Sequence, residues 1–306
     1  MARPQSAILP ESSNFALFMT LLVRPGGGQS VRSVGGLLEG IASDVAKLAG
    51  KPAPHCAMGI GSQRWDEVTG KARPKHLAPF KLVRDGARVA PSTPADLFFH
   101  LHSDHHDANF ALAREIRRAL GDAVTLVEEV HGFKHFGGRD LTGFVDGTEN
   151  PKGDDRAPVA LVGEEEPGFE GGSYVNIQRY VHDLVAWEKV SVQEQEGVIG
   201  RTKAEDQELP DETKPKTAHI ARVVIEEDGK ELEIVRHSMP YGTTHEAGLF
   251  FVAYGKTPEN FEKMLTRMMV AERHGHHDHL MRYTRAVTGC QFFVPSAEFL
   301  EQLATS

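Results

Sequence analysis

Strand-like and helix-like segments alternate along this chain in an order that occurs twice, and this repeat constrains the fold more than any other feature. Apolar and β-branched runs predict strands, and apolar residues that recur at helical spacing predict helices. In the first half these segments are strand Phe15–Val23, a helix from Val34 to a stop at Gly50, strands His55–Ile60 and Ala95–His102, helix Ala108–Leu120 and strand Val124–Val130. The predicted order of the first half is β-α-β-β-α-β.

The second half of the chain repeats that order. Its segments are strand Tyr174–Val181, a helical segment Leu184–Ile199, strands His219–Ile225 and Leu232–Arg236, strand Leu249–Tyr254, helix Asn260–Met269 and strand Ala286–Val294. The pair Asp228-Gly229 predicts a hairpin turn. The sequence therefore predicts an α+β fold of two ferredoxin-like domains, each with an antiparallel sheet.

The boundary between the two halves is predicted from composition. The segment Lys152–Gly172 is rich in Gly, Pro, Asp and Glu, which is typical of a linker and a surface loop. We therefore expect one domain over residues 1–150 and a second over residues 151–306. A further loop is predicted over Thr202–Lys216, which is charged and contains proline.

The charge and the apolar segments exclude several classes of function. Acidic side chains outnumber basic ones by 43 to 34, and the net charge of −9 opposes binding to nucleic acid or to anionic lipid. The apolar run Phe15–Val23 is too short to span a bilayer, and no cleavage site follows it. Because only Cys56 and Cys290 are present, no disulfide framework is expected. These features predict a cytoplasmic protein without a membrane partner.

A short motif in the middle of the chain points to chemistry only in combination with distant residues. Gly143-Phe-Val-Asp146-Gly-Thr-Glu-Asn-Pro151 resembles by itself a strand that ends in a turn. His219, Arg236 and Asp278 follow it at long range. Taken singly, these three would be a partly buried histidine, a surface arginine and a solvated aspartate.

Together the four residues match what a haem peroxidase needs. A neutral imidazole ligates the iron, and a carboxylate on its other nitrogen makes it more electron-donating. On the opposite face a base relays a proton, and a fixed cation stabilises developing negative charge. His219, Asp278, Asp146 and Arg236 are the candidates for these roles in that order.

The motif and its neighbours resemble conserved blocks of the dye-decolorizing peroxidases. The Gly-x-x-Asp-Gly stretch resembles the family's characteristic motif, and four later segments resemble family blocks in the same order: Ile199–Lys203, the segment at His219, Val235–Gly242 and Asp278–Thr284. The likeness is greatest to the compact bacterial members, the B type. It implies two ferredoxin-like domains with haem b held mainly by the C-terminal one. Since the chain has no Cys-x-x-Cys-His attachment motif, the haem would be non-covalent.

The resemblance assigns roles to individual residues of this chain. It implies that His219 is the proximal iron ligand, Asp146 the distal acid-base residue and Arg236 the distal arginine. Further candidates for contact with the haem are Leu249 and Phe251 on the distal side, Asp278 beside the proximal histidine, and Arg201 at a propionate.

One position departs from the family pattern. Members of this type often have Asn two places after the distal arginine, whereas this chain has Ser238, which is shorter and offers one donor where an amide offers two. Peroxide positioning near Ser238 is therefore expected to differ. We also expect Arg236 to lower the pKa of Asp146, so that its carboxylate stays ionised well into acidic conditions.

The leading interpretation is a peroxidase that reduces hydrogen peroxide through a ferryl intermediate. It would then take electrons singly from bulky organic donors such as phenols and dyes. An alternative is a haem-handling protein for storage, delivery or iron removal, with incidental peroxidase activity. The resemblance implies self-association into a homo-oligomer. Packaging in an encapsulin shell is not favoured, because only Pro295–Ser306 follow the last predicted strand.

Two histidine clusters suggest a third interpretation, a protein that binds divalent metal. His274, His276, His277 and His279 form one cluster, and His100, His102, His105 and His106 form the other. Imidazoles this close together can bind zinc, copper or nickel. Neither cluster has the cysteines or the helical His-x-x-x-His spacing of a dedicated site, so we interpret any metal binding there as adventitious.

Overall fold

The computed structural model describes residues 2–305, and its secondary structure begins with four long strands and two long helices. The elements of the first half are β1 (Phe15–Val23), α1 (Gly28–Ala49), β2 (His55–Gly61), α2 (Trp65–Thr69), β3 (Val83–Asp85), β4 (Arg88–Ala90), β5 (Leu97–Ser103), α3 (His106–Leu120), η1 (Gly121–Ala123) and β6 (Val124–Phe133).

The second half has shorter elements between its long strands. They are η2 (Gly153–Asp155), α4 (Arg156–Ala160), β7 (Ser173–His182), α5 (Leu184–Trp187), α6 (Val192–Ile199), α7 (His219–Val223), β8 (Glu226–Glu227), β9 (Lys230–Glu231), β10 (Val235–Arg236), β11 (Met239–Gly242), β12 (Ala247–Gly255), α8 (Glu259–Met269), η3 (His279–Arg282), β13 (Thr284–Ala286), β14 (Cys290–Val294) and α9 (Ala297–Ala304).

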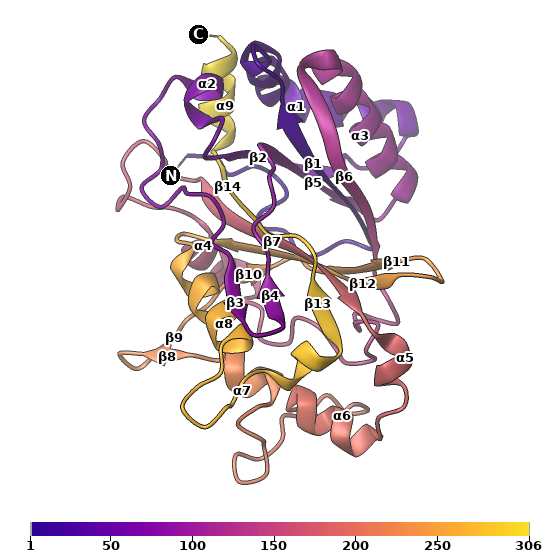
Figure 1. Ribbon diagram of the computed structural model, residues 1–306. Coiled ribbons are helices and arrows are strands. Elements are labelled where there is room, and N and C mark those ends of the chain that lie inside the picture. Colours follow the sequence, from indigo (N-terminus) through magenta and orange to yellow (C-terminus); the bar gives the residue numbers. More distant parts are fainter. Residues whose placement is uncertain (1, 306) are drawn as a thin grey trace.

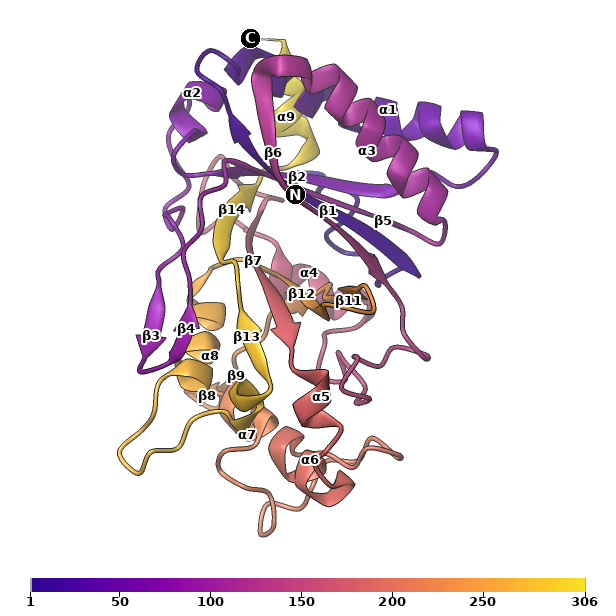
Figure 2. The same cartoon turned by 45° about the vertical axis from the view of Figure 1, so that its right-hand side comes forward.

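The long strands of both halves join in one antiparallel sheet that closes on itself. In the first half the strand order is β6-β1-β5-β2, and in the second it is β14-β7-β12-β11. The halves are linked where β14 pairs with β2 and where β11 pairs with β6. Because β12 pairs with both β11 and β7, the strands form a closed ring, which Figures 1 and 2 show from two sides.

Helices cover the outer face of this ring at its two ends. Helices α1, α2, α3 and α9 lie together at one end, and α5, α6, α7 and α8 lie at the other (Figures 1 and 2). The outward residues of β5, Leu97, Phe99 and Leu101, pack in the core beneath α1 and α3. The alternate residue Phe98 packs inside the ring against the second half. The alternation of one strand thus builds two cores.

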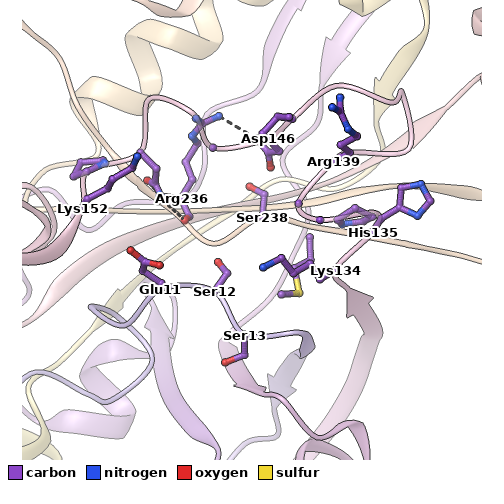
Figure 3. A pocket seen from close by; sticks show the side chains of 18 of the residues that line it. Glu11, Ser12, Ser13, Lys134, His135, Arg139, Asp146, Lys152, Arg236 and Ser238 are labelled. Carbon is purple, nitrogen blue, oxygen red and sulfur yellow. Dashed lines mark hydrogen bonds and ion pairs between the residues drawn. The ribbon is translucent and has the colours of Figure 1, made fainter. Parts of the chain in front are cut away.

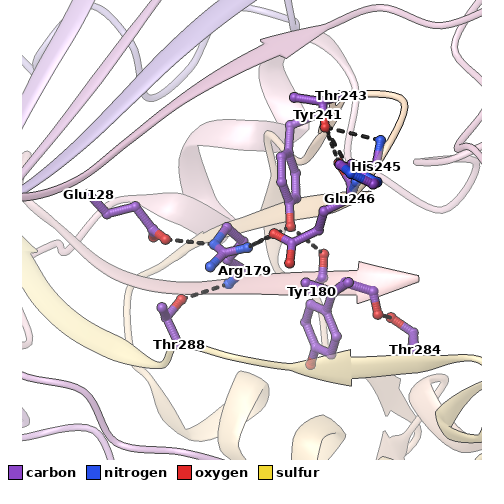
Figure 4. A network of polar contacts seen from close by, with 10 residues as sticks. Glu128, Arg179, Tyr180, Tyr241, Thr243, His245, Glu246, Thr284 and Thr288 are labelled. Carbon is purple, nitrogen blue, oxygen red and sulfur yellow. Dashed lines mark hydrogen bonds and ion pairs between the residues drawn. The ribbon is translucent and has the colours of Figure 1, made fainter. Parts of the chain in front are cut away.

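A network of polar contacts fastens the two halves where the ring closes. Arg179 on β7 donates from Nε to Glu128 on β6 at 2.6 Å and from one terminal nitrogen to Glu246 at 2.8 Å. The same arginine donates to the Tyr241 hydroxyl at 2.9 Å, and that hydroxyl donates to the backbone oxygen of Tyr180 (Figure 4). Bonds to charged groups of this kind contribute more than neutral ones.

Much of the predicted element order is confirmed, including the strand Phe15–Val23 with its predicted ends. The first helix ends at Gly50, which takes a left-handed conformation with φ of +62°. The helical segment Leu184–Ile199 is interrupted, because Ser191 caps a new helix, α6. The single closing strand predicted over Ala286–Val294 is wrong, since it consists of two strands, β13 and β14.

Two predictions about loops and strands need correction. The strand predicted over His219–Ile225 is wrong, because residues 219–223 form helix α7, which packs against α8. Tertiary contacts here override the β preference of the branched side chains. The segment Lys152–Gly172 is more than a surface loop, because it contains helix α4, whose Arg156 is buried at 3% exposure.

Candidate active site

The loop that follows β6 holds Asp146 in a fixed position. Gly143 and Gly147 on either side of it have φ values of +90° and +81°, a conformation that favours glycine. The backbone N–H of Asp146 donates to the Gly138 oxygen at 3.0 Å. Between them, Phe144 is buried against Trp187. The apolar and glycine positions of the motif therefore anchor the loop and present the Asp146 carboxylate.

Asp146 meets Arg236, which lies at the end of the short strand β10. A terminal nitrogen of Arg236 is 3.4 Å from the Asp146 carboxylate, and both side chains are about one quarter exposed, at 22% and 26%. Figure 3 shows the two side chains directed toward each other. The expected approach of these two residues, which lie 90 positions apart in the sequence, is confirmed.

Asn150 ties the Asp146 loop to the strand of Arg236. Its side-chain oxygen accepts from the backbone N–H of Arg236 at 2.8 Å, and its side-chain nitrogen donates to the Arg236 carbonyl at 2.9 Å. The sequence analysis treated Asn150 only as part of a turn. The adjacent Pro151 marks the turn, but no local pattern indicates a partner 86 residues away.

Asp146, Arg236 and Ser238 line an open pocket with a volume of about 280 Å³ (Figure 3). Other charged or polar side chains on its walls are Glu11, Ser12, Ser13, Lys134, His135, Arg139, Asn150, Lys152 and Arg156. A water molecule takes about 30 Å³ in the liquid, so the pocket has room for a peroxide with several waters. Ser238 accepts a bond from the backbone N–H of Val252 at 3.4 Å.

The expectation that the pKa of Asp146 lies below its usual range is wrong. Burial raises the pKa of Asp146, because the low-dielectric surroundings penalise the charged form. The charge of Arg236 lowers it, but not enough to offset burial, and nearby Asp140 raises it further. The carboxyl is therefore protonated over a wider pH range than an exposed aspartate.

His219 and Asp278 form a second pair on another part of the site. The Nδ1 atom of His219 is 2.6 Å from Oδ2 of Asp278, which is fully buried. The other carboxylate oxygen of Asp278 accepts from the Leu280 N–H at 2.9 Å, so the aspartate also caps η3. His219 is the first residue of α7. With Nδ1 held by the carboxylate, Nε2 is the ring nitrogen left for a metal.

The remaining predicted residues lie away from the pocket. Arg201 binds Asp206 at 2.8 Å and Glu149, from the Asp146 loop, at 3.1 Å. Leu249 and Phe251 alternate on β12 with the interior residue Phe250, and they face the core under α8. The pocket is thus formed by Asp146, Arg236 and Ser238 alone among the predicted residues. His219 nevertheless has a lowering influence on the Asp146 pKa, so the two pairs are within electrostatic reach.

His182 and Asp140 form a third pair, partly buried, that no sequence pattern indicates. The Nε2 atom of His182 lies 3.2 Å from a carboxylate oxygen of Asp140, and its Nδ1 lies 2.8 Å from the Thr284 hydroxyl. Burial raises the pKa of Asp140, but the contact with His182 and further bonds outweigh it and hold that pKa below the usual range. This pair supports the start of the Asp146 loop from beneath.

None of the helices within residues 2–305 combines the length and the apolar character needed to cross a membrane.

Comparisons with known proteins cover nearly the whole chain. A family model described as Dyp-type peroxidase, N-terminal, matches residues 5–134, and one described as Dyp-type peroxidase, C-terminal, matches residues 137–299. A dye-decolorizing peroxidase of Rhodococcus erythropolis is 40% identical over 303 residues, covering 98% of this chain and 89% of that protein.

Solved structures agree with the sequence matches. A DypB variant from Rhodococcus jostii RHA1 in complex with heme is 43% identical and covers 97% of both chains with a TM-score of 0.92. The encapsulated DyP-type peroxidase from Mycobacterium smegmatis is 38% identical and covers 98% of both chains with a TM-score of 0.94. The two family models, the sequence identity and the shared fold lead to one conclusion: this chain belongs to the Dyp-type peroxidase family.

Proposed function

We propose that this protein is a haem b peroxidase that reduces hydrogen peroxide and oxidises bulky organic donors in one-electron steps. The observation that carries the proposal is the occurrence of two residue pairs within electrostatic reach of each other, His219 with Asp278 and Asp146 with Arg236. The first pair suits an axial iron ligand, and the second suits proton transfer to bound peroxide. The related DypB variant in complex with heme supports the choice of cofactor.

The residues around His219 fit a non-covalent haem. The imidazole has one ring nitrogen held by a buried carboxylate, which makes the other a stronger ligand. Leu249 and Phe251 pack on β12 against the core under α8, and we propose that their apolar surface contacts the distal side of the haem. Arg201, which is bound to Glu149 and Asp206, would turn toward a propionate, for which its planar guanidinium is suited. Bound haem would supply the iron at which peroxide is reduced.

Asp146 would act as the proton carrier of the peroxide reaction. In its ionised form the carboxylate would accept the proton of one peroxide oxygen and return it to the other, which would leave as water with two electrons supplied by bound haem. The raised pKa of Asp146 matches this task, because a stronger base accepts the proton more readily. The cost is a smaller ionised fraction at acidic pH.

Arg236 and Asn150 would support that transfer in different ways. The guanidinium, 3.4 Å from the carboxylate, stabilises the negative charge that develops on the departing oxygen. Asn150 contacts only the backbone of Arg236 and therefore acts as a positioning residue. Ser238 would order water or peroxide in the pocket with its single hydroxyl.

We further infer that the chain consists of two ferredoxin-like domains, residues 1–150 and 151–306, with haem held mainly by the second. The matching strand orders of the two halves support the duplication. The position of His219, Arg236 and Asp278 in the second half supports the placement of the haem.

We propose that the protein is cytoplasmic and that it self-associates. That the protein is not packaged in an encapsulin shell is a further prediction. The encapsulated DyP-type peroxidase from Mycobacterium smegmatis argues against this prediction. Residues 297–304 form α9, which packs on α1.

Peroxide turnover by the purified protein would test the proposed function. Full-length protein loaded with haem is mixed with peroxide and a dye donor, beside the variants Asp146→Ala and Arg236→Leu. We expect loss of dye oxidation in both variants with haem binding retained. Turnover at the wild-type rate in both would contradict the assigned roles. Release of free porphyrin from haem under anaerobic, peroxide-free conditions, with slow peroxide turnover, would favour a haem-handling protein.

A further inference from the structure

Three histidines meet inside the closed sheet, apart from the proposed haem ligand. His100 and His102 lie on one face of β5, and His237 directly follows β10. Each is buried at 1% exposure. One ring nitrogen of each lies within 4.8 Å of a ring nitrogen of the other two. His237 belongs to neither histidine cluster of the sequence, and only the pairing of distant strands brings it to the other two.

The Nδ1 atom of each histidine faces a hydroxyl group. His100 Nδ1 is 3.0 Å from the Tyr254 hydroxyl, and His102 Nδ1 is 2.9 Å from that of Ser13. His237 Nδ1 is 3.5 Å from the hydroxyl of Ser12. Histidines that bind metals commonly donate their second ring N–H to such a partner, which fixes the tautomer. With the ring protons on Nδ1, the Nε2 atoms of His100, His102 and His237 would be the ones that face a ligand.

One of the Nε2 atoms lacks a partner. His102 Nε2 is buried and has no hydrogen-bond partner among residues 2–305. His237 Nε2 has two neighbours, the Ile8 carbonyl oxygen at 2.8 Å and a terminal nitrogen of Arg156 at 2.8 Å. Buried polar atoms are almost always paired, so the orphan at His102 indicates a missing water or ion. A cation beside His102 Nε2 would satisfy this atom.

We propose that His100, His102 and His237 bind one divalent first-row cation that prefers imidazole, such as Zn²⁺, through their Nε2 atoms. Zinc binds histidine nitrogen at about 2.1 Å, which places ligating nitrogens about 3.4 Å apart in a tetrahedron. The present separations of up to 4.8 Å would have to shorten by up to about 1.4 Å, which rotation about the broad χ2 torsion of histidine can supply. The Ile8 carbonyl would offer an oxygen at the fourth position.

The buried histidines are in the protonation state that a metal requires. Burial lowers the pKa of His237 to about 3, and it holds the pKa values of His100 and His102 well below the usual range. All three imidazoles are therefore neutral near pH 7, and a cation need not displace protons from them.

Arg156 is a charged group that opposes occupancy of this site. It donates to His237 Nε2 at 2.8 Å, and its own Nε is buried without a hydrogen-bond partner in the described part of the chain. It also lines the pocket next to Glu11, whose charge favours the ionised guanidinium. We infer that Arg156 turns toward Glu11 when the cation enters. Ser12 and Ser13 line the same pocket, so a single layer of side chains separates it from the histidines.

Zinc binding by the full-length, haem-loaded protein without an affinity tag tests the proposal. Equilibrium dialysis against Zn²⁺ would measure stoichiometry and affinity, and zinc-edge X-ray absorption would report the ligands. We expect a single tight site with nitrogen ligands at about 2.1 Å. The variants His102→Gln and His237→Gln should weaken it at least about tenfold. Wild-type affinity in either variant would overturn the proposal.

Two further variants separate this site from surface binding and from misfolding. His276→Ala with His277→Ala removes two side chains of the exposed cluster and should leave the tight site unchanged; loss of that site would overturn the proposal. Arg156→Met removes the opposing charge and should tighten binding by about tenfold or more. A misfolded variant would not give such a gain. Unchanged or weaker binding in Arg156→Met would contradict a cation beside this arginine.

Discussion

Asn150 and Arg236 are joined by two reciprocal hydrogen bonds between the asparagine amide and the arginine backbone. The contact fixes the loop of Asp146 against the strand of Arg236, although 86 residues separate the two partners in sequence. The geometry of the Asp146 carboxylate and the Arg236 guanidinium therefore depends on a residue that touches neither group.

Substitutions of Asn150 should test whether its two hydrogen bonds position the Asp146 carboxylate and the Arg236 guanidinium. In Asn150→Ala both bonds are lost, and we expect a decrease in the free energy of unfolding of about 1–3 kcal/mol. Because a small displacement of reacting groups is costly, kcat/KM for peroxide should fall by up to about 100-fold. Stopped-flow kinetics of the haem-loaded protein would measure this. Asn150→Asp, which keeps the acceptor for the Arg236 N–H, serves as the matched control, and a wild-type kcat/KM in Asn150→Ala would refute the positioning role.

The pH dependence of the peroxide reaction should follow the Asp146 pKa. Burial raises that pKa, and Arg236 lowers it in part. The ionised carboxylate is the active form, so kcat/KM should decline as pH falls through a value above the ordinary aspartate pKa of about 3.9. Arg236→Leu removes the lowering influence and should move this decline to higher pH, whereas Arg236→Lys keeps the charge. Identical pH profiles for Arg236→Leu and Arg236→Lys would contradict an electrostatic effect of Arg236 on the Asp146 pKa.

The ionised carboxylate of Asp146, which the peroxide reaction needs, should lower the stability of the folded protein. A carboxyl whose pKa is raised on folding destabilises the folded state above that pKa, and this penalty is absent below the unfolded pKa. Asp146→Asn resembles the protonated form. We expect it to raise the melting temperature of the haem-loaded protein at pH 7 and to lose this advantage near pH 4. A lower melting temperature at pH 7 would show that the ionised form is the better accommodated one.

The pair of His219 with Asp278 predicts a change in haem binding and reduction potential. Asp278→Asn keeps an acceptor for the His219 Nδ1–H but removes the charge, so the iron should become easier to reduce. Asp278→Ala removes both and should weaken haem affinity by about 10–100-fold. Spectroelectrochemistry and haem titration would measure the two effects. Equal potentials in wild type and Asp278→Asn would show that the carboxylate does not tune the ligand.

Patterns in the sequence predicted those helices and strands whose ends are set by neighbouring residues. The helical spacing that ends at Gly50 and the apolar run Phe15–Val23 both appear in the structure with the expected character. The closed ring was not predicted, because the pairing of β14 with β2 joins residues over 200 positions apart and leaves no periodic trace. The helix that begins at His219 was missed since packing against α8 overrides the preference of its branched residues.

The two contacts of the candidate site could be expected from the sequence, but its electrostatics only in part. The approach of Asp146 to Arg236 and of His219 to Asp278 agrees with the family resemblance. The sign of the Asp146 pKa shift was wrong, because burial cannot be read from sequence. The meeting of His237 with His100 was likewise invisible, since it requires the fold to bring β5 beside the end of β10.

The most direct test of the central claim is the absorption spectrum of the protein during haem titration and after addition of one equivalent of peroxide, compared between wild type and His219→Gln. We predict that wild type gains a Soret band typical of an imidazole-ligated ferric haem and that this band changes rapidly with peroxide, while His219→Gln shows neither. A wild-type protein that stays colourless, or a His219→Gln variant with the same spectrum and the same response to peroxide, would contradict the proposal.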